Sequence, residues 1–441
     1  MASSSTSIEP GVVPAGRRVS GRLEVPPSKS ATHRAFNLAL LAGGDTVVER
    51  PLDAEDTRLF LVALETCGMT VERRPGEVRL RRGAGRDSGD SIGGGDIFCG
   101  NAGTMLRFLA ATLAALPGHW RLDGAARLRE RPVGPLVDAL RQLGAAIEYL
   151  GRDGYPPLVV EGGTLRGGRA RLDAGESSQY LSALLMAGQR ASAPLEIEVS
   201  ALVSAPYVEL TRRAIAAFGG HVERRGDREF AVAPSSLAAG RVTVEGDYSA
   251  ACYAAAAAAL TGGRVALDGL DPDSAQGDRG FLELLGEMGA RVSFGPRAIE
   301  VAAGGLRAVD ADLGAMPDQV PTLAALAPFA EGTTRIRNVR HLRIKESDRL
   351  AAMAAGLRRL GAAVEEEAGG LVVPGVWARR APPSTPVEVD PQGDHRIAMS
   401  LALVGLRRPG VRVRTPEVVA KSYPGFWRDL AALLAVESSA P

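Results

Sequence analysis

The sequence repeats itself, and this internal repeat restricts the folds open to the chain more than any other feature. A helical pattern, then a glycine, then a short strand-like segment occurs five times, for example as ALRQLGAAIE and GLRRLGAAVE. The five glycines lie 70 to 76 residues apart, at Gly68, Gly144, Gly219, Gly289 and Gly361. Glycine at this place is typical of a helix C-terminus that needs a positive φ. We therefore expect copies of one α/β unit.

Each copy also begins in the same way, with a strand, a loop of small and polar residues, and a helix rich in alanine and leucine. Six beginnings can be read: PPSKSATHRAFNLALLAGG, CGNAGTMLRFLAATLAAL, GESSQYLSALLMAG, EGDYSAACYAAAAAALTGG, GAMPDQVPTLAALAPFAEG and QGDHRIAMSLALVGL. A chain of 441 residues is too long for one core, because single cores stop growing at roughly 250 to 300 residues. The sequence thus predicts two similar domains, each of three βαβα-type repeats. A repeat alone fits a binding scaffold as well as an enzyme.

Composition argues against several functional classes. The net charge of +1 comes from 52 basic and 51 acidic residues, which is not the field of a protein that coats nucleic acid or an anionic membrane. Three separated cysteines without a CxxC pair predict neither a disulfide framework nor a zinc site. The N-terminus has no apolar signal segment, and no apolar run reaches the roughly 18 residues of a membrane span. We expect a cytoplasmic monomer without nucleic-acid or membrane partners.

The loops that open the predicted helices carry runs of charge. Helix N-termini expose unpaired backbone N–H groups and attract anions. The runs are Arg127, Arg129 and Arg131 in RLRERP; Arg343, Lys345, Glu346, Asp348 and Arg349 in RIKESDR; and Asp394, His395 and Arg396 in GDHR. One such run is usually a solvated surface. Three runs, all at predicted helix starts of a repeated unit, indicate local anion sites.

Lysine is rare and its placement is informative. Of the 52 lysine and arginine residues, only Lys29, Lys345 and Lys421 are lysine, and all three fall in repeat loops. Lysine provides a compact charge and a transferable proton, which arginine does not. Asp318 follows a proline at a predicted helix start, where a capping role is the ordinary explanation. Asp318 and Glu346 are nevertheless candidates for general acid or base groups among these cations.

Motifs for other chemistries are missing from the sequence. It contains no GxxxxGK[ST], GxGxxG or HExxH pattern, which are typical of phosphate-loop, dinucleotide and metal sites. The residues therefore predict an enzyme without cofactor or metal. It would act on small, strongly anionic substrates in a cleft where helix N-termini of two domains converge.

Nine segments carry a resemblance to a known family. In order, they are PPSKSATHRA, GNAGTMLR, RERPVGPLVDAL, SSQYLSALL, LVSAPYVE, PDQVPTLAALA, RIKESDRL, GDHRIAMSLAL and AKSYP, and together they resemble the 5-enolpyruvylshikimate-3-phosphate synthase family. The resemblance implies transfer of the enolpyruvyl group of phosphoenolpyruvate to the 5-hydroxyl of shikimate 3-phosphate, with release of phosphate and without a metal. It also implies two inside-out α/β barrels closing over a substrate cleft. Residues 1–27 and 246–441 would form the first domain, and residues 28–245 the second.

The resemblance assigns roles to residues that match the family motifs. Shikimate 3-phosphate would contact Lys29, Ser30, Arg34, Ser177, Ser178, Gln179, Ser204, Tyr207, Asp318 and Lys345. Phosphoenolpyruvate would contact Lys29, Gly103, Arg131, Gln179, Arg349, Arg396 and Lys421. The catalytic residues would be Lys29, Asp318 as the base near the 5-hydroxyl, and Glu346 as the group that handles the methylene proton.

Three positions depart from the family pattern: Pro27 replaces a glycine, Phe108 a proline, and His341 an asparagine. One alternative is the related enzyme that transfers enolpyruvate to UDP-N-acetylglucosamine, which resembles this chain but carries a reactive loop cysteine and lacks KESDR. Cys99 has no adjacent basic group and is expected to be inert. The other alternative is a catalytically silent repeat protein that binds anions.

Overall fold

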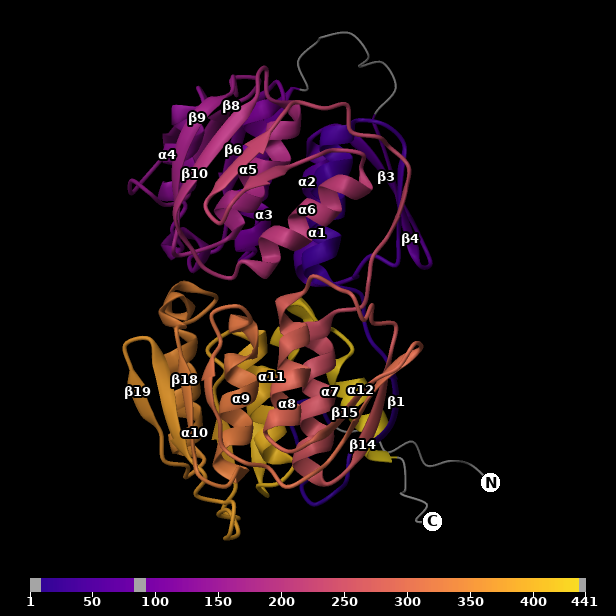
Figure 1. Cartoon of the computed structure of the whole chain (residues 1–441), viewed down its shortest axis with the longest axis vertical. Coiled ribbons are helices and arrows are strands. Elements are labelled where there is room, and N and C mark those ends of the chain that lie inside the picture. Colours follow the sequence, from indigo (N-terminus) through magenta and orange to yellow (C-terminus); the bar gives the residue numbers. More distant parts are fainter. Residues whose placement is uncertain (1–8, 83–92, 436–441) are drawn as a thin grey trace. The chain divides into compact units, whose positions relative to one another are not determined.

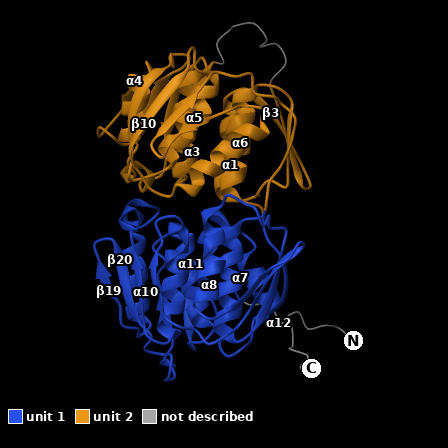
Figure 2. Cartoon of the chain, viewed as in Figure 1, with its two compact units in different colours: residues 1–26, 246–441 blue, residues 27–245 orange. Residues whose placement is uncertain are grey.

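The computed structural model describes residues 9–82 and 93–435, which divide into two compact units (Figure 2). Unit 1 contains the chain up to Pro26 and from Gly246 onward, and unit 2 contains residues 27–245. Each unit buries its own apolar core. The α/β class predicted from the sequence is confirmed, with mixed sheets and helices in both units.

Unit 2 repeats one arrangement three times (Figure 1). The first copy contains β13 (Arg241–Thr243), α1 (Lys29–Ala42), β2 (Thr46–Glu49), α2 (Glu55–Thr66), β3 (Met69–Arg74) and β4 (Glu77–Arg82). The second contains β5 (Gly94–Phe98), α3 (Gly103–Ala115), β6 (His119–Asp123), η1 (Leu128–Glu130), α4 (Gly134–Gln142), β7 (Ala146–Tyr149) and β8 (Leu158–Glu161). The third contains β9 (Gly168–Ala174), α5 (Gln179–Ala187), β10 (Leu195–Leu202), α6 (Pro206–Ala217), β11 (Glu223–Arg225) and β12 (Glu229–Val232).

Unit 1 has the same plan, with a shorter last copy. The first copy contains β1 (Ser20–Glu24), α7 (Tyr248–Thr261), β14 (Arg264–Asp268), η3 (Gly277–Arg279), α8 (Gly280–Glu287), β15 (Arg291–Phe294) and β16 (Ala298–Ala302). The second contains β17 (Asp310–Asp312), η4 (Pro317–Gln319), α9 (Val320–Leu326), β18 (Thr333–Arg337), η6 (Arg340–Ile344), α10 (Arg349–Arg359), β19 (Glu365–Glu367) and β20 (Gly370–Pro374). The third contains β21 (Val387–Val389), α11 (His395–Gly405), β22 (Val411–Val413), η7 (Pro416–Lys421) and α12 (Phe426–Ala435).

Every four-stranded sheet has the same pairing. The first two strands run parallel, and a hairpin then adds two antiparallel strands, as in the order β5-β6-β8-β7. The last sheet of unit 1 lacks this hairpin and contains only β21 and β22. The sequence had indicated a single strand after each second helix, so the hairpin extends the predicted repeat.

The first strands of two repeats are exchanged along the chain. β1 directly precedes α1 in sequence, yet it pairs with β14, with Leu23 opposite Leu267. β13 directly precedes α7, yet it pairs with β2, with Val242 opposite Val48. The chain therefore completes β1 in unit 1 before it enters unit 2, and it completes β13 in unit 2 before it returns to unit 1.

The first helices of the repeats form the centre of each unit. α1, α3 and α5 pack against one another in unit 2, as do α7, α9 and α11 in unit 1. α7 is buried along nearly its whole length, and its sequence YSAACYAAAAAALT supplies mostly small side chains. Small side chains allow neighbouring helices to approach closely, so an alanine-rich helix suits a position enclosed on all sides.

The glycines that end the second helices have the predicted conformation. Their φ values are 82° at Gly68, 92° at Gly144, 75° at Gly219, 107° at Gly289 and 92° at Gly361. Each lies in the left-handed region, which residues with a side chain rarely adopt. The expectation of glycine-capped helices is confirmed. Within the described residues, no helix is long and apolar enough to cross a membrane.

Candidate active site

In unit 1, the N-terminus of α10 places an arginine among three carboxylates. Asp348 caps this helix by accepting a hydrogen bond from the backbone N–H of Ala351 (3.0 Å), so Arg349 begins the helix. Only 1% of Arg349 is exposed. Its Nη1 lies 2.8 Å from Asp318, its Nη2 2.8 Å from Glu346, and its Nε 2.7 Å from Asp394. Burial alone would lower the pKa of Arg349, but these carboxylates outweigh burial and raise it.

Asp318 lies between two guanidinium groups. Its second oxygen is 2.7 Å from Nη2 of Arg396, on the first turn of α11. Burial would raise the pKa of Asp318, but the charges of Arg396 and Arg349 hold that pKa below its ordinary value. Asp318 belongs to η4, and Gln319 stands at the N-cap position of α9. The ordinary explanation of Asp318 as a cap therefore does not hold.

Asp394 connects α10 with α11. It caps α11 by accepting a hydrogen bond from the backbone N–H of Arg396 (2.9 Å), and it also accepts from Ser347 Oγ (3.1 Å). The side chain of Asp394 is fully buried. It thus holds Arg349 and the start of α11 in one fixed arrangement.

The cluster continues beyond Arg396 to a second carboxyl. Arg396 Nη2 donates to Ser249 Oγ (3.4 Å), and Ser249 is hydrogen-bonded to Asp278 in η3. Burial, together with the charge of Asp318, raises the pKa of Asp278 to about 6. Neither Ser249 nor Asp278 was singled out in the sequence.

Three further positions of interest lie on the short helical turns of unit 1. Lys345 follows η6 and is partly buried, and Lys421 ends η7 and is buried. His341, in η6, is buried, and its Nε2 has no hydrogen-bond partner. Burial and the nearby charge of Lys345 lower the pKa of His341 to about 3. This histidine is therefore neutral at physiological pH.

In unit 2, Lys29 begins α1. Ser28 caps the helix by accepting from the backbone N–H of Ala31 (3.4 Å), so the residue that follows Pro27 sets the helix start. Lys29 Nζ lies 3.3 Å from Asp56 on α2, and 14% of the lysine side chain is exposed, against 4% of the aspartate side chain. Asp56 was not predicted; it lies on the first turn of α2, where DAEDTRLF opens the second helix of the first repeat.

Arg34 joins α1 to α6. Its Nε donates to Thr211 Oγ1 (2.8 Å), its Nη1 to the backbone oxygen of Ser30 (2.8 Å), and its Nη2 to the backbone oxygen of Tyr207 (2.9 Å). The guanidinium also lies over the ring of Phe108, 5.4 Å from its centroid. Burial lowers the pKa of Arg34 to about 10, so the group stays charged at neutral pH. Ser30, Arg34 and Tyr207 are thus brought together as one group.

Gln179 joins α5 to α3. Its Oε1 accepts from Arg107 Nη1 (2.7 Å), and its Nε2 donates to Thr104 Oγ1 (2.9 Å). Ser177 and Ser178 are buried immediately before α5. Arg107 had been read only as part of the GNAGTMLR motif and had no assigned role.

Ser204 precedes α6 in a conformation unusual for serine. Its φ is 53°, in the left-handed region. Its backbone oxygen accepts a hydrogen bond from the N–H of Tyr207 (3.1 Å), which closes the turn into α6. A residue held in this region is commonly found at functional turns.

Gly103 and Arg131 approach each other closely. Arg131 Nη1 donates to the backbone oxygen of Asn101 (2.9 Å), and a Cβ atom at position 103 would lie 2.6 Å from Arg131 Nη2. Of the three arginines in RLRERP, only Arg131 is buried. Arg127 and Arg129 instead form exposed ion pairs with neighbouring carboxylates.

The structure brings the predicted residues of unit 1 together more closely than those of unit 2. In unit 1, Asp318, Glu346, Arg349 and Arg396 form one ion-paired cluster. In unit 2, the predicted residues form separate groups around Arg34, Gln179, Arg131 and Lys29. The unpredicted partners Asp56, Arg107, Ser249 and Asp278 lie in the repeated loops or on the helices that follow them. Their position in the repeat was the only signal that could have found them.

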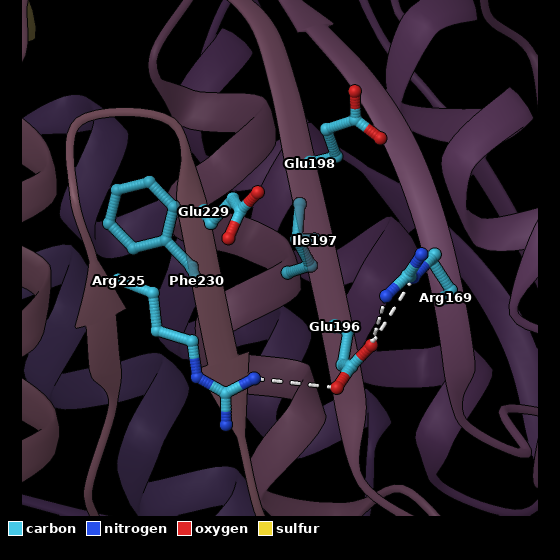
Figure 3. Close-up of a pocket in the computed structure, with 7 residues that line it drawn as sticks. All are labelled: Arg169, Glu196, Ile197, Glu198, Arg225, Glu229 and Phe230. Carbon is cyan, nitrogen blue, oxygen red and sulfur yellow. Dashed lines mark hydrogen bonds and ion pairs between the residues drawn. The ribbon is translucent and has the colours of Figure 1, made fainter.

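The remaining polar features of the described residues do not add a second site. No group of three or more His, Cys, Asp or Glu side chains there could hold a metal ion. Cys67, Cys99 and Cys252 are buried, and burial raises the pKa of each thiol. Figure 3 shows a pocket on the outer face of the β9–β12 sheet. There, Glu196 pairs with Arg169 (3.0 Å) and with Arg225 (3.4 Å). These charged side chains of the pocket therefore largely neutralise one another.

Comparisons with known proteins agree across nearly the whole chain. Residues 13–430 match the family model described as EPSP synthase (3-phosphoshikimate 1-carboxyvinyltransferase). Proteins of that latter name from Syntrophobacter fumaroxidans and Methanoculleus marisnigri are 45% and 43% identical to this chain. The alignments cover 94% and 93% of this chain and 97% and 96% of those proteins.

A solved structure gives the same result. The EPSP synthase from Acinetobacter baumannii superposes with a TM-score of 0.77 at 29% identity, covering 96% of this chain and 97% of that one. The match therefore extends over both units and is not limited to a shared motif. The chain belongs to the EPSP synthase (3-phosphoshikimate 1-carboxyvinyltransferase) family.

Proposed function

We propose that this protein transfers the enolpyruvyl group of phosphoenolpyruvate to the 5-hydroxyl of shikimate 3-phosphate. In the overall reaction, the hydroxyl oxygen forms a bond to C2 of phosphoenolpyruvate, the bond between C2 and the phosphate oxygen breaks, and phosphate leaves. The observation that carries the proposal is the match to 3-phosphoshikimate 1-carboxyvinyltransferases along nearly the full length of both chains. The product belongs to the route to chorismate and the aromatic amino acids.

Both substrates are anions, which explains why the proposed site uses so many cations. Phosphate and carboxylate groups bind well to arginine forks and to lysine. We assign Gly103, Arg131, Gln179, Arg349, Arg396 and Lys421, with Lys29, to phosphoenolpyruvate. We assign Ser30, Arg34, Ser177, Ser178, Gln179, Ser204, Tyr207, Asp318 and Lys345, again with Lys29, to shikimate 3-phosphate.

Asp318 would act as the base near the 5-hydroxyl. Arg349 and Arg396 keep it ionised, and an ionised carboxylate can accept a proton. As long as no substrate is bound, the same two arginines also make Asp318 a weak base, because they lower its pKa. An anionic substrate bound to them would oppose their effect on Asp318, so we expect the pKa of Asp318 to rise when the site fills.

Glu346 would supply the proton that the methylene carbon of phosphoenolpyruvate receives. Protonation there makes C2 electrophilic, the hydroxyl oxygen attacks, and the tetrahedral intermediate expels phosphate while the proton is removed again. Arg349 Nη2 holds one oxygen of Glu346 at 2.8 Å and so fixes the position of the carboxyl group, of whose side chain 10% is exposed. Lys29 would contact both substrates and stabilise the charge that develops on the phosphate.

We infer that each unit is an inside-out α/β barrel of three repeats, that the substrate cleft draws on both domains, and that the divisions near residues 27 and 245 are domain boundaries. We further propose a cytoplasmic monomer that needs no cofactor and has no nucleic-acid or membrane partner, in keeping with the net charge of +1.

The alternative acceptor, UDP-N-acetylglucosamine, is not favoured. The relatives carry the name of the shikimate enzyme, and the buried Cys99 has a raised thiol pKa, which is unsuited to a reactive loop cysteine. The alternative of a silent anion-binding protein predicts binding without turnover.

Phosphate release tests these alternatives directly. The purified protein would be mixed with phosphoenolpyruvate and either shikimate 3-phosphate or UDP-N-acetylglucosamine. We expect release only with shikimate 3-phosphate. Release only with the nucleotide sugar would assign the protein to the alternative reaction, and no release with either acceptor would support the silent protein.

A further inference from the structure

A buried polar chain in unit 1 leads from Arg396 to a carboxyl group that has no role in the proposed reaction. Arg396 Nη2 donates to Ser249 Oγ at 3.4 Å, and the same oxygen is hydrogen-bonded to Asp278. Arg396, Ser249 and Asp278 are 6%, 8% and 2% exposed. The same nitrogen, Arg396 Nη2, also pairs with Asp318 at 2.7 Å. Asp278 is thus one hydroxyl group away from an arginine of the proposed site.

The serine hydroxyl has a single hydrogen, so its direction depends on Asp278. When Asp278 is ionised, Ser249 donates this hydrogen to the carboxylate and presents a lone pair to Arg396. When Asp278 is protonated, the carboxylic acid donates to Ser249 instead, and the serine hydrogen becomes available to another acceptor. The protonation of Asp278 therefore changes what Arg396 faces.

The surroundings of Asp278 place its ionisation near neutral pH. The groups that face it are Asp247 and Cys252 from the start of α7, Asp318 from η4 and Arg396 from α11, while Glu283 of the adjacent α8 pairs with Arg279 at 2.6 Å. Burial and the negative charge of Asp318 raise the pKa of Asp278 to about 6, although Arg396 opposes them. Asp278 consequently changes its charge within the range in which enzymes are usually assayed.

We propose that Asp278 is a positioning residue that acts through Ser249 on Arg396, and that its ionisation weakens the attraction of Arg396 for an anionic substrate. This inference rests on the proposed function, in which Arg396 binds phosphoenolpyruvate. When Asp278 is neutral, it does not compete with the substrate for the positive charge of Arg396. When Asp278 is ionised, its negative charge near Arg396 weakens the attraction between Arg396 and the anionic substrate. The effect is specific to phosphoenolpyruvate, because Arg396 is not assigned to shikimate 3-phosphate.

The test compares the wild-type enzyme with Asp278→Asn, which keeps the shape and a hydrogen-bonding group but cannot ionise. KM for each substrate is measured from pH 5.5 to 8. At pH 7.5, we expect KM for phosphoenolpyruvate to be higher in the wild type by about threefold to tenfold, the latter corresponding to coupling of one pKa unit. This ratio should fall toward one at pH 5.5, because Asp278 is then mostly protonated in the wild type. Ionisation of the substrate itself affects both proteins equally and cancels in the ratio. The corresponding ratio for shikimate 3-phosphate should stay near one.

Two further variants complete the design. Glu283→Gln removes one negative charge from α8 at the surface, where water screens it, and it should keep the wild-type pH profile. Ser249→Ala removes the connecting hydroxyl, so KM for phosphoenolpyruvate should lose the pH dependence that Asp278 gives it, while KM for shikimate 3-phosphate stays unchanged. If Asp278→Asn fails to fold, Ser249→Ala still tests whether Asp278 acts on Arg396 through this hydroxyl group.

The outcomes separate this inference from the proposed function. A ratio between wild type and Asp278→Asn that does not change with pH would overturn the inference alone. So would a Ser249→Ala variant that keeps the wild-type pH dependence of KM for phosphoenolpyruvate. Absence of phosphate release by the wild type would overturn the proposed function and the inference with it. A pH-dependent ratio confined to phosphoenolpyruvate would establish Asp278 as the positioning residue.

Discussion

Lys29 is held by a carboxylate on the next helix. Its Nζ lies 3.3 Å from Asp56, and both side chains are largely buried. A buried pair of this kind fixes the position of the ammonium group, which would otherwise sample many rotamers. A fixed, compact positive charge suits the proposed contact with both substrates.

We expect Lys29→Met to lower kcat/KM by about 10²–10⁴-fold, the range typical of a lost charged or proton-transferring group. Lys29→Arg should recover little of this activity, because a planar guanidinium does not replace a compact ammonium group. Phosphate release measures activity, and thermal unfolding shows that the fold is kept. Normal turnover by Lys29→Met would show that Lys29 has no role in the reaction.

Glu346 has a matched control in the same region of unit 1. Glu346 pairs with Arg349 at 2.8 Å, and Glu366 pairs with Arg343 at 2.7 Å. Because Glu346 is proposed to transfer a proton, Glu346→Gln should lower kcat much more than it changes either KM. Glu366→Gln loses the same charge outside the proposed site and should keep its kcat. A change confined to KM in Glu346→Gln would contradict the proton-transfer role.

His341 should make the folded state sensitive to acid. Burial lowers its pKa from 6.5 to about 3, so below pH 6.5 the unfolded chain binds a proton that the folded protein does not. The free energy of unfolding should therefore fall as the pH falls from 6.5 toward 3, with a loss of about 2 kcal/mol at pH 5 from this residue. Above pH 6.5, the residue should have no such effect.

The check on His341 is chemical denaturation at pH 7.5 and pH 5. The wild type should lose about 2 kcal/mol more than His341→Asn between these values. His119, which is exposed on β6 and bonded to Glu161, provides the control variant His119→Asn, which should behave like the wild type. Equal losses in wild type and His341→Asn would show that His341 does not stay neutral when folded.

At the scale of elements, the C-terminus of α8 provides a test of the glycine caps. Gly289 has a φ of 107°, and an added Cβ would lie 2.3 Å from the backbone oxygen of Gly305. Gly286, three residues earlier on the same helix, has no heavy atom within 4 Å of an added Cβ. The two positions thus differ in backbone conformation and in space, although both are glycine.

We expect opposite effects of alanine at these two positions. Gly289→Ala should destabilise the protein by more than about 1 kcal/mol, because alanine is strained at this φ and clashes with backbone. Gly286→Ala should stabilise it by about 0.5–1 kcal/mol, because alanine favours a helix interior. Chemical denaturation measures both. A stabilised Gly289→Ala variant would contradict the capping role.

The sequence predicted the helices and their caps better than it predicted the contacts of single side chains. The helices and their glycine caps depend on local pattern, and the pattern identified them. The charge run alone did not separate Arg131 from Arg127 and Arg129, since all three have the same local context, and only the family resemblance singled out Arg131. Arg131 is itself buried, and it donates to the backbone oxygen of Asn101 (2.9 Å). The partner, rather than the charge run, distinguishes a site residue from a surface one.

At the scale of the whole molecule, the exchanged strand β1 makes unit 1 discontinuous in sequence, whereas unit 2 is one continuous segment. Unit 2 contains all its strands within residues 27–245, whereas unit 1 needs β1, which lies more than 200 residues before the rest of that unit. Residues Val19, Leu23 and Val25, on or beside β1, are part of the unit 1 core.

We therefore expect residues 27–245 alone to fold cooperatively, as measured by circular dichroism and thermal unfolding. Residues 246–441 alone should not, because a sheet edge and part of the core are missing. Joining residues 9–26 to the C-terminus of that fragment through a flexible linker should restore a cooperative transition. Cooperative folding of residues 246–441 without β1 would show that the exchanged strand is dispensable.

The sequence by itself determined the α/β class, the repeated unit and the family, because helical periodicity, glycine caps and loop motifs are local properties. Only the tertiary structure decided which strands pair and which side chains meet. β1 pairs with β14 rather than with a strand beside α1, and Arg349 gathers Asp318 and Asp394 from 31 and 45 residues away. Such contacts arise from the packing of distant segments, so no local pattern records them. For the same reason, the sequence showed Arg396 but not the serine and the buried carboxyl group behind it.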